Sequence, residues 1–197
     1  MPQQYAPGTA LVVVDVQVDF ADPAGGLYVA GGEDVVPLVN AEVDAAVAAG
    51  SPVVFTQDWH PEHTPHFAQD GGTWPVHCVA GTPGAELAPG LRVPEGASRV
   101  RKGTGTEDGY SGFSEVDLAS GRTDATRLGA LLQEAGVRRL VVVGLAGDHC
   151  VRATALDGAR LGYDVTVPLA VTRFVALRPE DPQRARADMA AAGVHLV

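Results

Sequence analysis

Cysteine is scarce in this chain: Cys78 and Cys150 are the two cysteines in 197 residues. Two cysteines are too few for a disulfide-stabilised scaffold, so this class of protein is excluded. A single bridge between Cys78 and Cys150 stays open as an alternative. In a reducing compartment, Cys150 would instead remain a free thiol.

Basic residues are also few, with 14 Lys and Arg against 24 Asp and Glu and a formal net charge of −10. This charge would repel nucleic acid and anionic membranes, so we expect neither as a partner. No stretch is long and uncharged enough to span a bilayer, and residues 1–9 lack the features of a signal peptide. With 46% hydrophobic residues, the chain is expected to form one cytoplasmic domain over residues 1–197.

Lysine occurs once, at Lys102, while the other 13 basic residues are arginine. An ammonium group is compact and can titrate, whereas a guanidinium group in a protein keeps its proton. Because the chain uses arginine elsewhere, we predict that position 102 needs a lysine for its chemistry. The alternative is that the single lysine stands there by chance.

Apolar runs alternate with segments of helical periodicity, a pattern typical of an α/β protein. The strands are predicted at 10–15, 51–56, 97–101, 140–143, 163–167 and 194–197, and the helices at 33–49, at 123–135, from 150 onward and at 180–192. Crossover connections between such strands are right-handed, and the strands they join are parallel. We therefore predict a parallel sheet of about six strands with helices on both faces.

Candidate reactive groups follow the ends of four predicted strands: Asp15, Asp58, Lys102 and the turn before Cys150. In parallel sheets of this kind, ligands bind outside the carboxyl ends of the strands. The sequence thus predicts one site at this edge of the sheet. Residues 59–96 contain six prolines and form a loop long enough to have a function of its own.

Cys150 is predicted to be a nucleophile at the start of a helix. The apolar run 140–143 ends in a glycine-rich turn, Asp148 is placed to cap the helix, and Cys150 falls in its first turn. There the helix dipole would lower the pKa of the thiol. The alternative is a buried cysteine that packs as a small hydrophobic residue.

The thiol needs a base, and the sequence offers two candidates. His149 is adjacent to Cys150, but successive side chains on a helix diverge by about 100°, so we expect His149 to point away. Asp15 is better placed, and Lys102 would balance the charge of a Cys–Asp pair. Alternatively, Asp15 caps a helix or ends a strand in solvent.

Four of the six histidines lie within 18 residues, from 60 to 77. Asp58 and His60 are two residues apart at a predicted strand end, where extended backbone places their side chains on one face. With His66 and His77 they would form a site for a divalent transition ion, and His63 is the spare. The alternative is a polar surface loop with stray histidines.

Several short motifs together resemble those of one family. They are VDVQVDF at 14–20, DWH at 58–60, WPVHC at 74–78, KG at 102–103, YSGF at 110–113 and VGLAGDHCV at 143–151. In order and approximate spacing, they resemble the nicotinamidase (pyrazinamidase) family of isochorismatase-like cysteine hydrolases. The resemblance implies an isochorismatase-like fold, a Rossmann-like sandwich of three layers.

The resemblance also implies two sets of functional residues. The first is a catalytic triad made up of Asp15, Lys102 and Cys150. The second is a set of ligands for one divalent metal ion, for which zinc is favoured and iron or manganese would also serve: Asp58, His60, His66 and His77.

Further features of the site follow from the same resemblance. A cis peptide between Leu145 and Ala146 would turn backbone N–H groups inward, so that those of Ala146 and Cys150 form an oxyanion hole. Gly147 departs from the family pattern, which usually has Thr there, and the loop between residues 102 and 110 varies in length among relatives. The implied substrate contacts are Phe20, Trp74 and Tyr110, the last less firmly because of that loop.

The implied activity is hydrolysis of nicotinamide to nicotinate and ammonia through a Cys150 thioester, with pyrazinamide as a further substrate. One rival is another carboxamide or N-carbamoyl amidase of the superfamily, which would lack the Asp–His–His–His set. A second rival is a non-catalytic protein that binds nicotinamide or a metal. The sequence leaves the oligomeric state open, a homo-oligomer included.

Overall fold

The computed structural model describes residues 1–197 and contains a six-stranded sheet in which all the pairings are parallel. The strand order is β3-β2-β1-β7-β8-β9. These strands are β1 (Thr9–Val14), β2 (Val53–Asp58), β3 (Ser98–Lys102), β7 (Arg139–Gly144), β8 (Asp164–Val167) and β9 (His195–Leu196). The predicted parallel sheet is confirmed, and the boundaries of all six strands differ from the prediction by at most two residues.

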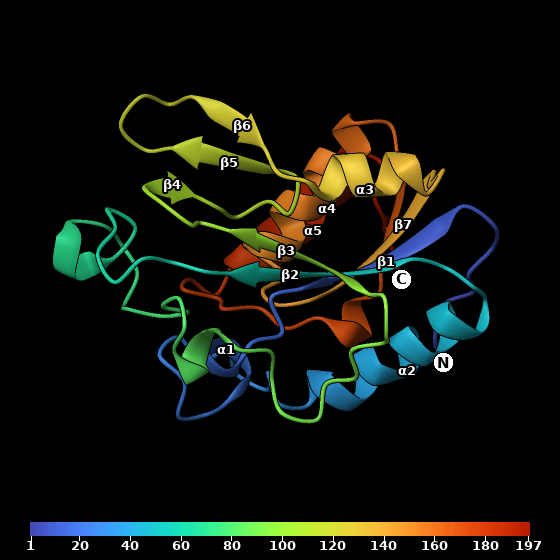
Figure 1. Ribbon diagram of the computed structural model, residues 1–197, viewed down its shortest axis with the longest axis horizontal. Helices are drawn as coiled ribbons and strands as arrows, with labels where there is room; N and C mark the ends of the chain where they lie inside the picture. The colour runs from blue at the N-terminus through green and yellow to red at the C-terminus, as the bar shows by residue number, and fades with distance from the viewer.

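Helices cover both faces of this sheet (Figure 1). They are α1 (Val18–Ala21), α2 (Val35–Ala48), α3 (Leu128–Glu134), α4 (Cys150–Arg160) and α5 (Asp181–Ala191). Because strand side chains alternate between faces, Leu11 and Val13 of β1 pack in the core that includes α2. Ala10 and Val12 pack in the core that includes α3, α4 and α5. The predicted three-layer α/β fold is therefore confirmed.

A second, three-stranded antiparallel sheet was not predicted. It consists of β4 (Glu107–Asp108), β5 (Ser114–Asp117) and β6 (Thr123–Ala125), and Figure 1 shows it beside α3 and α4. The predicted helix 123–135 is thus wrong at its start. Residues 123–125 pair with β5 instead, and the helix begins at Leu128 because this tertiary pairing overrides the local helical pattern.

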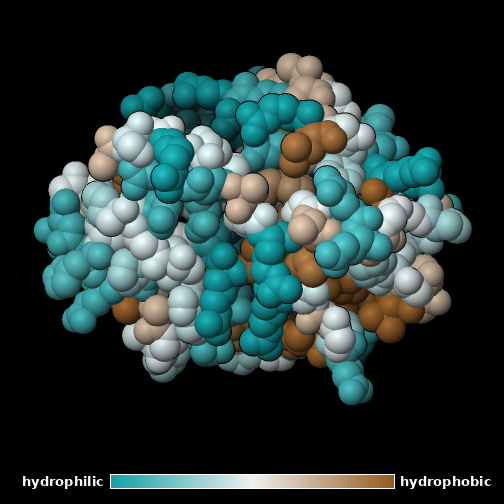
Figure 2. Space-filling view, turned by 45° about the horizontal axis from the view of Figure 1, so that its top comes forward, coloured by the Kyte–Doolittle hydropathy of each residue, from teal (hydrophilic) through white to brown (hydrophobic).

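The segment between β2 and β3 is largely irregular, as its prolines predict, with short 3-10 turns at Ala68–Asp70 and Pro83–Ala85. Hydrophilic residues predominate on the face shown in Figure 2, and hydrophobic ones gather mainly toward the right of that view. None of the helices combines the length and the apolar character that a membrane crossing requires.

Neighbouring strands end at the same level, which sets the position of the site. Val14 lies opposite Gly144, and Asp58 lies opposite Lys102. Gly144 has a φ of +113°, and a Cβ there would meet the Val14 carbonyl oxygen at 2.2 Å, so the close approach of β1 and β7 requires glycine. Asp15, just past β1, has a φ of 49° and turns away from the strand.

Candidate functional site

The sheet brings Asp15, Lys102 and Cys150 together at its carboxyl edge. The Lys102 Nζ lies 2.8 Å from Asp15 Oδ2 and 3.5 Å from Cys150 Sγ. All three side chains are buried. Thr56 on β2 donates a hydrogen bond of 2.6 Å to the other Asp15 oxygen and so orients the carboxylate. The three residues predicted as a triad therefore lie within one buried cluster.

Burial determines the protonation of this cluster. It raises the pKa of the Cys150 thiol well above its usual value, and the Lys102 ammonium only partly opposes the shift. The expectation that the helix dipole lowers the thiol pKa is therefore wrong for this buried site. Burial likewise raises the pKa of Asp15, to about 6, against the opposing effect of Lys102. The resting thiol keeps its proton, and a carboxylate able to accept it lies nearby.

Asp58 connects this cluster to the histidines. Burial would raise its pKa, but the Lys102 ammonium and the imidazoles of His60 and His77 outweigh burial and hold the pKa below its usual range. One oxygen, Oδ1, accepts a hydrogen bond from Lys102 Nζ. The other, Oδ2, lies 3.7 Å from His60 Nε2 and 4.0 Å from His77 Nε2. A single buried carboxylate thus faces both groups of residues.

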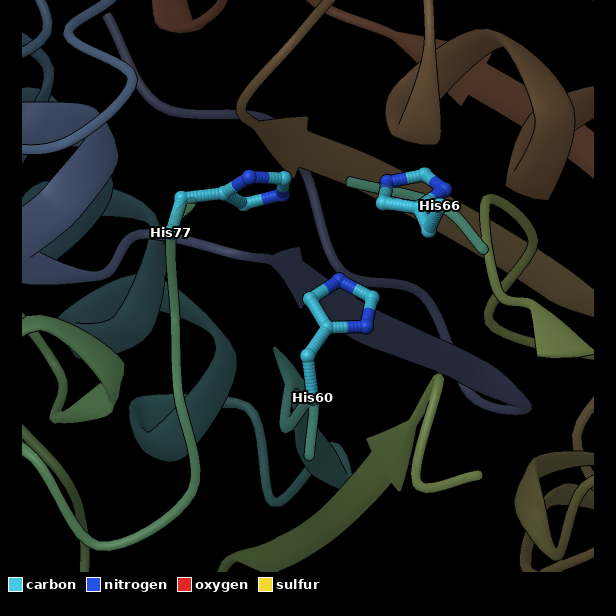
Figure 3. Close-up of side chains that lie close together, drawn as sticks. All are labelled: His60, His66 and His77. Atoms are coloured by element: carbon cyan, nitrogen blue, oxygen red, sulfur yellow. The ribbon is translucent and has the colours of Figure 1, made fainter. Parts of the chain in front are cut away.

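His60, His66 and His77 converge from the irregular segment after β2, and their rings face one another in Figure 3. Each offers a ring nitrogen within 4.8 Å of the others, and all three side chains are buried. His63 lies apart, exposed and paired with Asp70. The clustering matches the sequence prediction for the three histidines, and His63 is the spare.

Hydrogen bonds select the tautomer of two of these imidazoles. His60 Nδ1 lies 3.0 Å from the Gly103 carbonyl oxygen, and His77 Nδ1 lies 2.7 Å from that of Pro75. A carbonyl oxygen only accepts, so each Nδ1 carries the proton and each Nε2 keeps its lone pair. The buried His60 Nε2 has no hydrogen-bond partner in the chain. Lone pairs facing a carboxylate oxygen are the donor set of a divalent transition ion, so these residues fit a metal.

Two backbone N–H groups are free beside the thiol. The Leu145–Ala146 peptide is cis, as the family resemblance implied. The Ala146 carbonyl oxygen accepts hydrogen bonds from the N–H groups of His149 and Val151, whereas those of Ala146 and Cys150 have no acceptor in the chain. These two free donors have the chemistry that an oxyanion hole requires.

The cluster opens into a pocket lined by twelve residues. Its apolar wall includes Leu27, Val29 and Val175, none of which the sequence had indicated. The residues predicted to contact substrate also line it: Phe20, Trp74 and Tyr110. Trp74 Nε1 donates a hydrogen bond of 2.7 Å to the Tyr110 hydroxyl, which ties the two rings together. The pocket thus combines an aromatic wall with the thiol and the histidines.

Two expectations for the helix start are wrong. Asp148 does not cap α4, because its carboxylate accepts hydrogen bonds from the N–H groups of Val175 and Ala176. His149 does not point away, since its ring lies edge-on to Trp74 and lines the pocket. No hydrogen bond joins His149 to Cys150, whereas an Asp15 oxygen lies within 4.8 Å of the Cys150 sulfur, so Asp15 remains the choice of base.

Gln17 and Asp19 hold the site together: the sequence predicts Asp19 as a structural acid, without naming its contact, and gives no role to Gln17. The Gln17 amide bonds both the N–H and the carbonyl of Asp58, each at 2.8 Å, and so fixes the backbone of that residue. Asp19 accepts a hydrogen bond from the Cys78 N–H and thereby anchors the segment after His77. Both lie in the motif at 14–20, but no periodicity or spacing distinguishes them from surface polar residues.

The presence of Gly147, where the family usually has Thr, has a steric explanation. A Cβ at this position would lie 2.6 Å from the Phe174 ring and 2.8 Å from the Thr172 methyl group. The Phe174 ring therefore occupies space that a threonine side chain would need. Cys78 and Cys150 are both free, so the alternative of a bridge between them is excluded.

The fold and the site define a class of protein: a parallel α/β domain with a buried cysteine, a carboxylate and a lysine at the carboxyl edge of its sheet. The isochorismatase domain model matches residues 9–195, nearly the whole chain, and the chain belongs to this family.

Relatives of known identity are similar over almost their full length. The nicotinamidase/pyrazinamidase of Mycobacterium tuberculosis is 37% identical over 191 residues, which is 95% of this chain and 97% of that protein. The zinc complex of the Pyrococcus horikoshii pyrazinamidase has a TM-score of 0.86 at 38% identity, covering 97% of this chain and 99% of that one. The nicotinate complex of PnC1 from L. infantum has a TM-score of 0.88 at 35% identity, covering 100% and 96%.

Proposed function

We propose that this protein is a metal-dependent nicotinamidase that hydrolyses nicotinamide to nicotinate and ammonia and also accepts pyrazinamide. One observation carries the proposal: a single pocket is lined by the thiol of Cys150, by two histidines of the cluster and by Asp58, which faces both groups. The similarity to nicotinamidases and pyrazinamidases supports the same substrate class. The expected single domain and cytoplasmic location stay predictions.

The first half of the reaction is acylation of the thiol. Asp15 accepts the proton of Cys150, and the sulfur attacks the carboxamide carbon of the substrate. The N–H groups of Ala146 and Cys150 donate to the oxygen that becomes negative in the tetrahedral intermediate. When the C–N bond breaks, Asp15 returns its proton to the nitrogen, ammonia leaves, and a thioester remains.

The second half is hydrolysis of this thioester. Asp15 takes a proton from a water molecule, whose oxygen attacks the thioester carbon, and nicotinate leaves as the thiol regains its proton. Lys102 transfers no proton. Its ammonium, whose pKa burial would lower, is instead held charged by Asp15 and Asp58, which raise that pKa well above its usual value. Throughout the cycle it offsets negative charge beside the sulfur.

Asp58, His60, His66 and His77 would hold the metal ion. When bound, the ion would supply a Lewis acid that accepts the ring nitrogen of the substrate, directly or through water, and zinc is the first choice of metal. Phe20 and Trp74 would flank the ring, so that the carboxamide faces Cys150. Holding both ends of a small rigid ring in this way lowers the entropic cost of reaching the attack geometry.

Removal of the metal is expected to abolish turnover of nicotinamide, because the ring would lose its anchor. Activity and metal content are measured before dialysis against a chelator, after dialysis, and after addition of zinc, iron or manganese. Activity should return with whichever ion refills the site. An enzyme that contains no transition ion and stays active with chelator would instead be a metal-free amidase, such as an N-carbamoyl amide hydrolase.

Activity is also expected to fall on the acid side of about pH 6. Asp15 must be ionised to accept the thiol proton, and burial raises its pKa to about 6, so the ionised fraction drops as the pH falls through that value. The logarithm of kcat/KM should then decrease with a slope of roughly one per pH unit. Metal content is measured at each pH as a control. A profile that stays flat to about pH 4.5 with the metal retained would contradict Asp15 as the base.

A further inference from the structure

We propose that Asp108 is a positioning residue for His66, fixing the ring so that Nε2 is presented to the metal. Asp108 Oδ1 lies 3.2 Å from His66 Nδ1. That oxygen is buried and has no hydrogen-bond partner in the chain. The inference rests on the metal site in the proposed function and adds to it a residue that does not itself bind the ion.

The three imidazoles of the cluster differ in what faces Nδ1. For His60 and His77 the partner is a main-chain carbonyl oxygen, which fixes Nδ1 as the protonated nitrogen. His66 has no such carbonyl, and the group near its Nδ1 is the Asp108 carboxylate. Histidines that bind metals usually donate their other N–H to a carboxylate or carbonyl, which orients the ring and makes the ligand nitrogen more basic. The Asp108 carboxylate is the group placed to be this partner for the third imidazole, because its Oδ1 lies 3.2 Å from His66 Nδ1 and accepts no hydrogen bond from any other group.

The pairing of β4 with β5 holds Asp108 beside His66. β4 pairs with β5 through Glu107 opposite Asp117 and Asp108 opposite Val116. The two following residues also serve the site, since the Gly109 carbonyl oxygen accepts a hydrogen bond of 2.5 Å from Lys102 and Tyr110 lines the pocket. One short segment therefore touches the histidine cluster, the lysine and the substrate wall. A displacement of β4 would disturb all three.

The negative charge of Asp108 also suits the positioning of a metal-binding imidazole. The His66 side chain is 7% exposed and that of Asp108 is 22% exposed, so their interaction is only partly screened by solvent. A carboxylate facing Nδ1 raises the electron density at Nε2 more than a neutral carbonyl does. We therefore expect removal of the charge to weaken metal binding even where an amide oxygen takes the place of the carboxylate oxygen.

The test measures zinc retention by the zinc-loaded enzyme during competition with a chelator, without nicotinamide. Asp108→Ala should lower the zinc affinity about 10- to 100-fold, and Asp108→Asn should lower it less. Asp124→Asn is the matched control, because it removes one carboxylate from the exposed strand β6 of the same small sheet and should leave the affinity unchanged. The visible absorption of the cobalt-loaded enzyme should change in the Asp108 variants and not in the control.

The outcomes separate this role from the proposed function. If both Asp108 variants retain zinc as the parent does and give the parent cobalt spectrum, the role of Asp108 is wrong while the metal site stands. If the parent itself retains no zinc, the metal site and the role of Asp108 fail together. Ammonia release from nicotinamide by the parent tests the reaction independently. Should Asp108→Ala unfold, as circular dichroism would reveal, the isosteric Asp108→Asn decides the result.

Discussion

Replacement of Cys150 by alanine is expected to lower ammonia release from nicotinamide by at least about 10³-fold. The proposed pathway forms its bond to the substrate through this sulfur, and no other thiol lines the pocket. The variant should stay folded, because alanine keeps the small apolar volume at the start of α4. It should also keep its metal, because Cys150 is not among the proposed ligands.

Cys78 provides the matched control for this experiment. It is the second free and buried cysteine, and its sulfur makes only a weak contact of 3.8 Å with the Gly84 carbonyl oxygen. Cys78→Ala should therefore retain most of the activity. Ammonia release, circular dichroism and metal content are measured for both variants, and acid quenching of the parent during turnover should trap a nicotinoyl group on Cys150. Undiminished turnover by Cys150→Ala would contradict the proposed mechanism.

Replacement of Lys102 by methionine is expected to affect both stability and activity. Methionine fills a similar volume but leaves the carboxylates of Asp15 and Asp58 buried without their shared cation. Loss of one partner from a buried ion pair typically costs about 3–5 kcal/mol of unfolding free energy. The variant should therefore unfold at a lower denaturant concentration at pH 7, and it should release little ammonia.

The pH dependence of the loss of stability in Lys102→Met identifies its cause. Burial raises the pKa of Asp15 to about 6 even with Lys102 present, and without the ammonium the pKa should rise further. A carboxyl group whose pKa is higher in the folded than in the unfolded state binds its proton more tightly when folded. Its contribution to stability is present at low pH and is lost as the pH rises through the folded pKa. The difference between the variant and the parent should therefore shrink from pH 7 toward about pH 5.

Two further variants make this prediction specific. The double variant Lys102→Met with Asp15→Asn should be more stable at pH 7 than Lys102→Met alone, because one unpaired charge is gone. Arg101→Met is the control: Arg101 is the neighbouring residue on β3, is exposed, and stacks on Trp59 at 3.7 Å, so its loss should cost about 1 kcal/mol or less. Chelator is present in all unfolding measurements, so that metal binding does not contribute. Equal losses at pH 7 and pH 5 would argue against charge burial as the cause.

Much of the fold could be predicted because it depends on local patterns. Continuous apolar runs such as residues 10–14 mark strands buried on both faces, and glycines such as Gly50 mark where helices end. The predicted helix at 123–135 failed at its start because residues 123–125 pair with β5, a contact that the helical pattern does not encode. The whole β4–β5–β6 sheet was not predicted, because its strands are too short to show an alternation of apolar and polar residues.

The order and spacing of residues along the chain were enough to predict where the site lies and which residue types it contains. Parallel strands end at one edge, so Asp15, Asp58 and Lys102 had to meet there once their strands were recognised, and the spacing of Asp58 and His60 placed both on one face. How these groups act on one another depends instead on the packing of the folded chain. Asp58 turns one carboxylate oxygen to Lys102 and the other to the imidazoles, and Asp108 contacts His66. Both arrangements depend on distances between residues far apart in the chain. The raised pKa of the Cys150 thiol depends on burial, which outweighs the opposing charge of Lys102, and the local sequence does not show how deeply the start of a helix is buried.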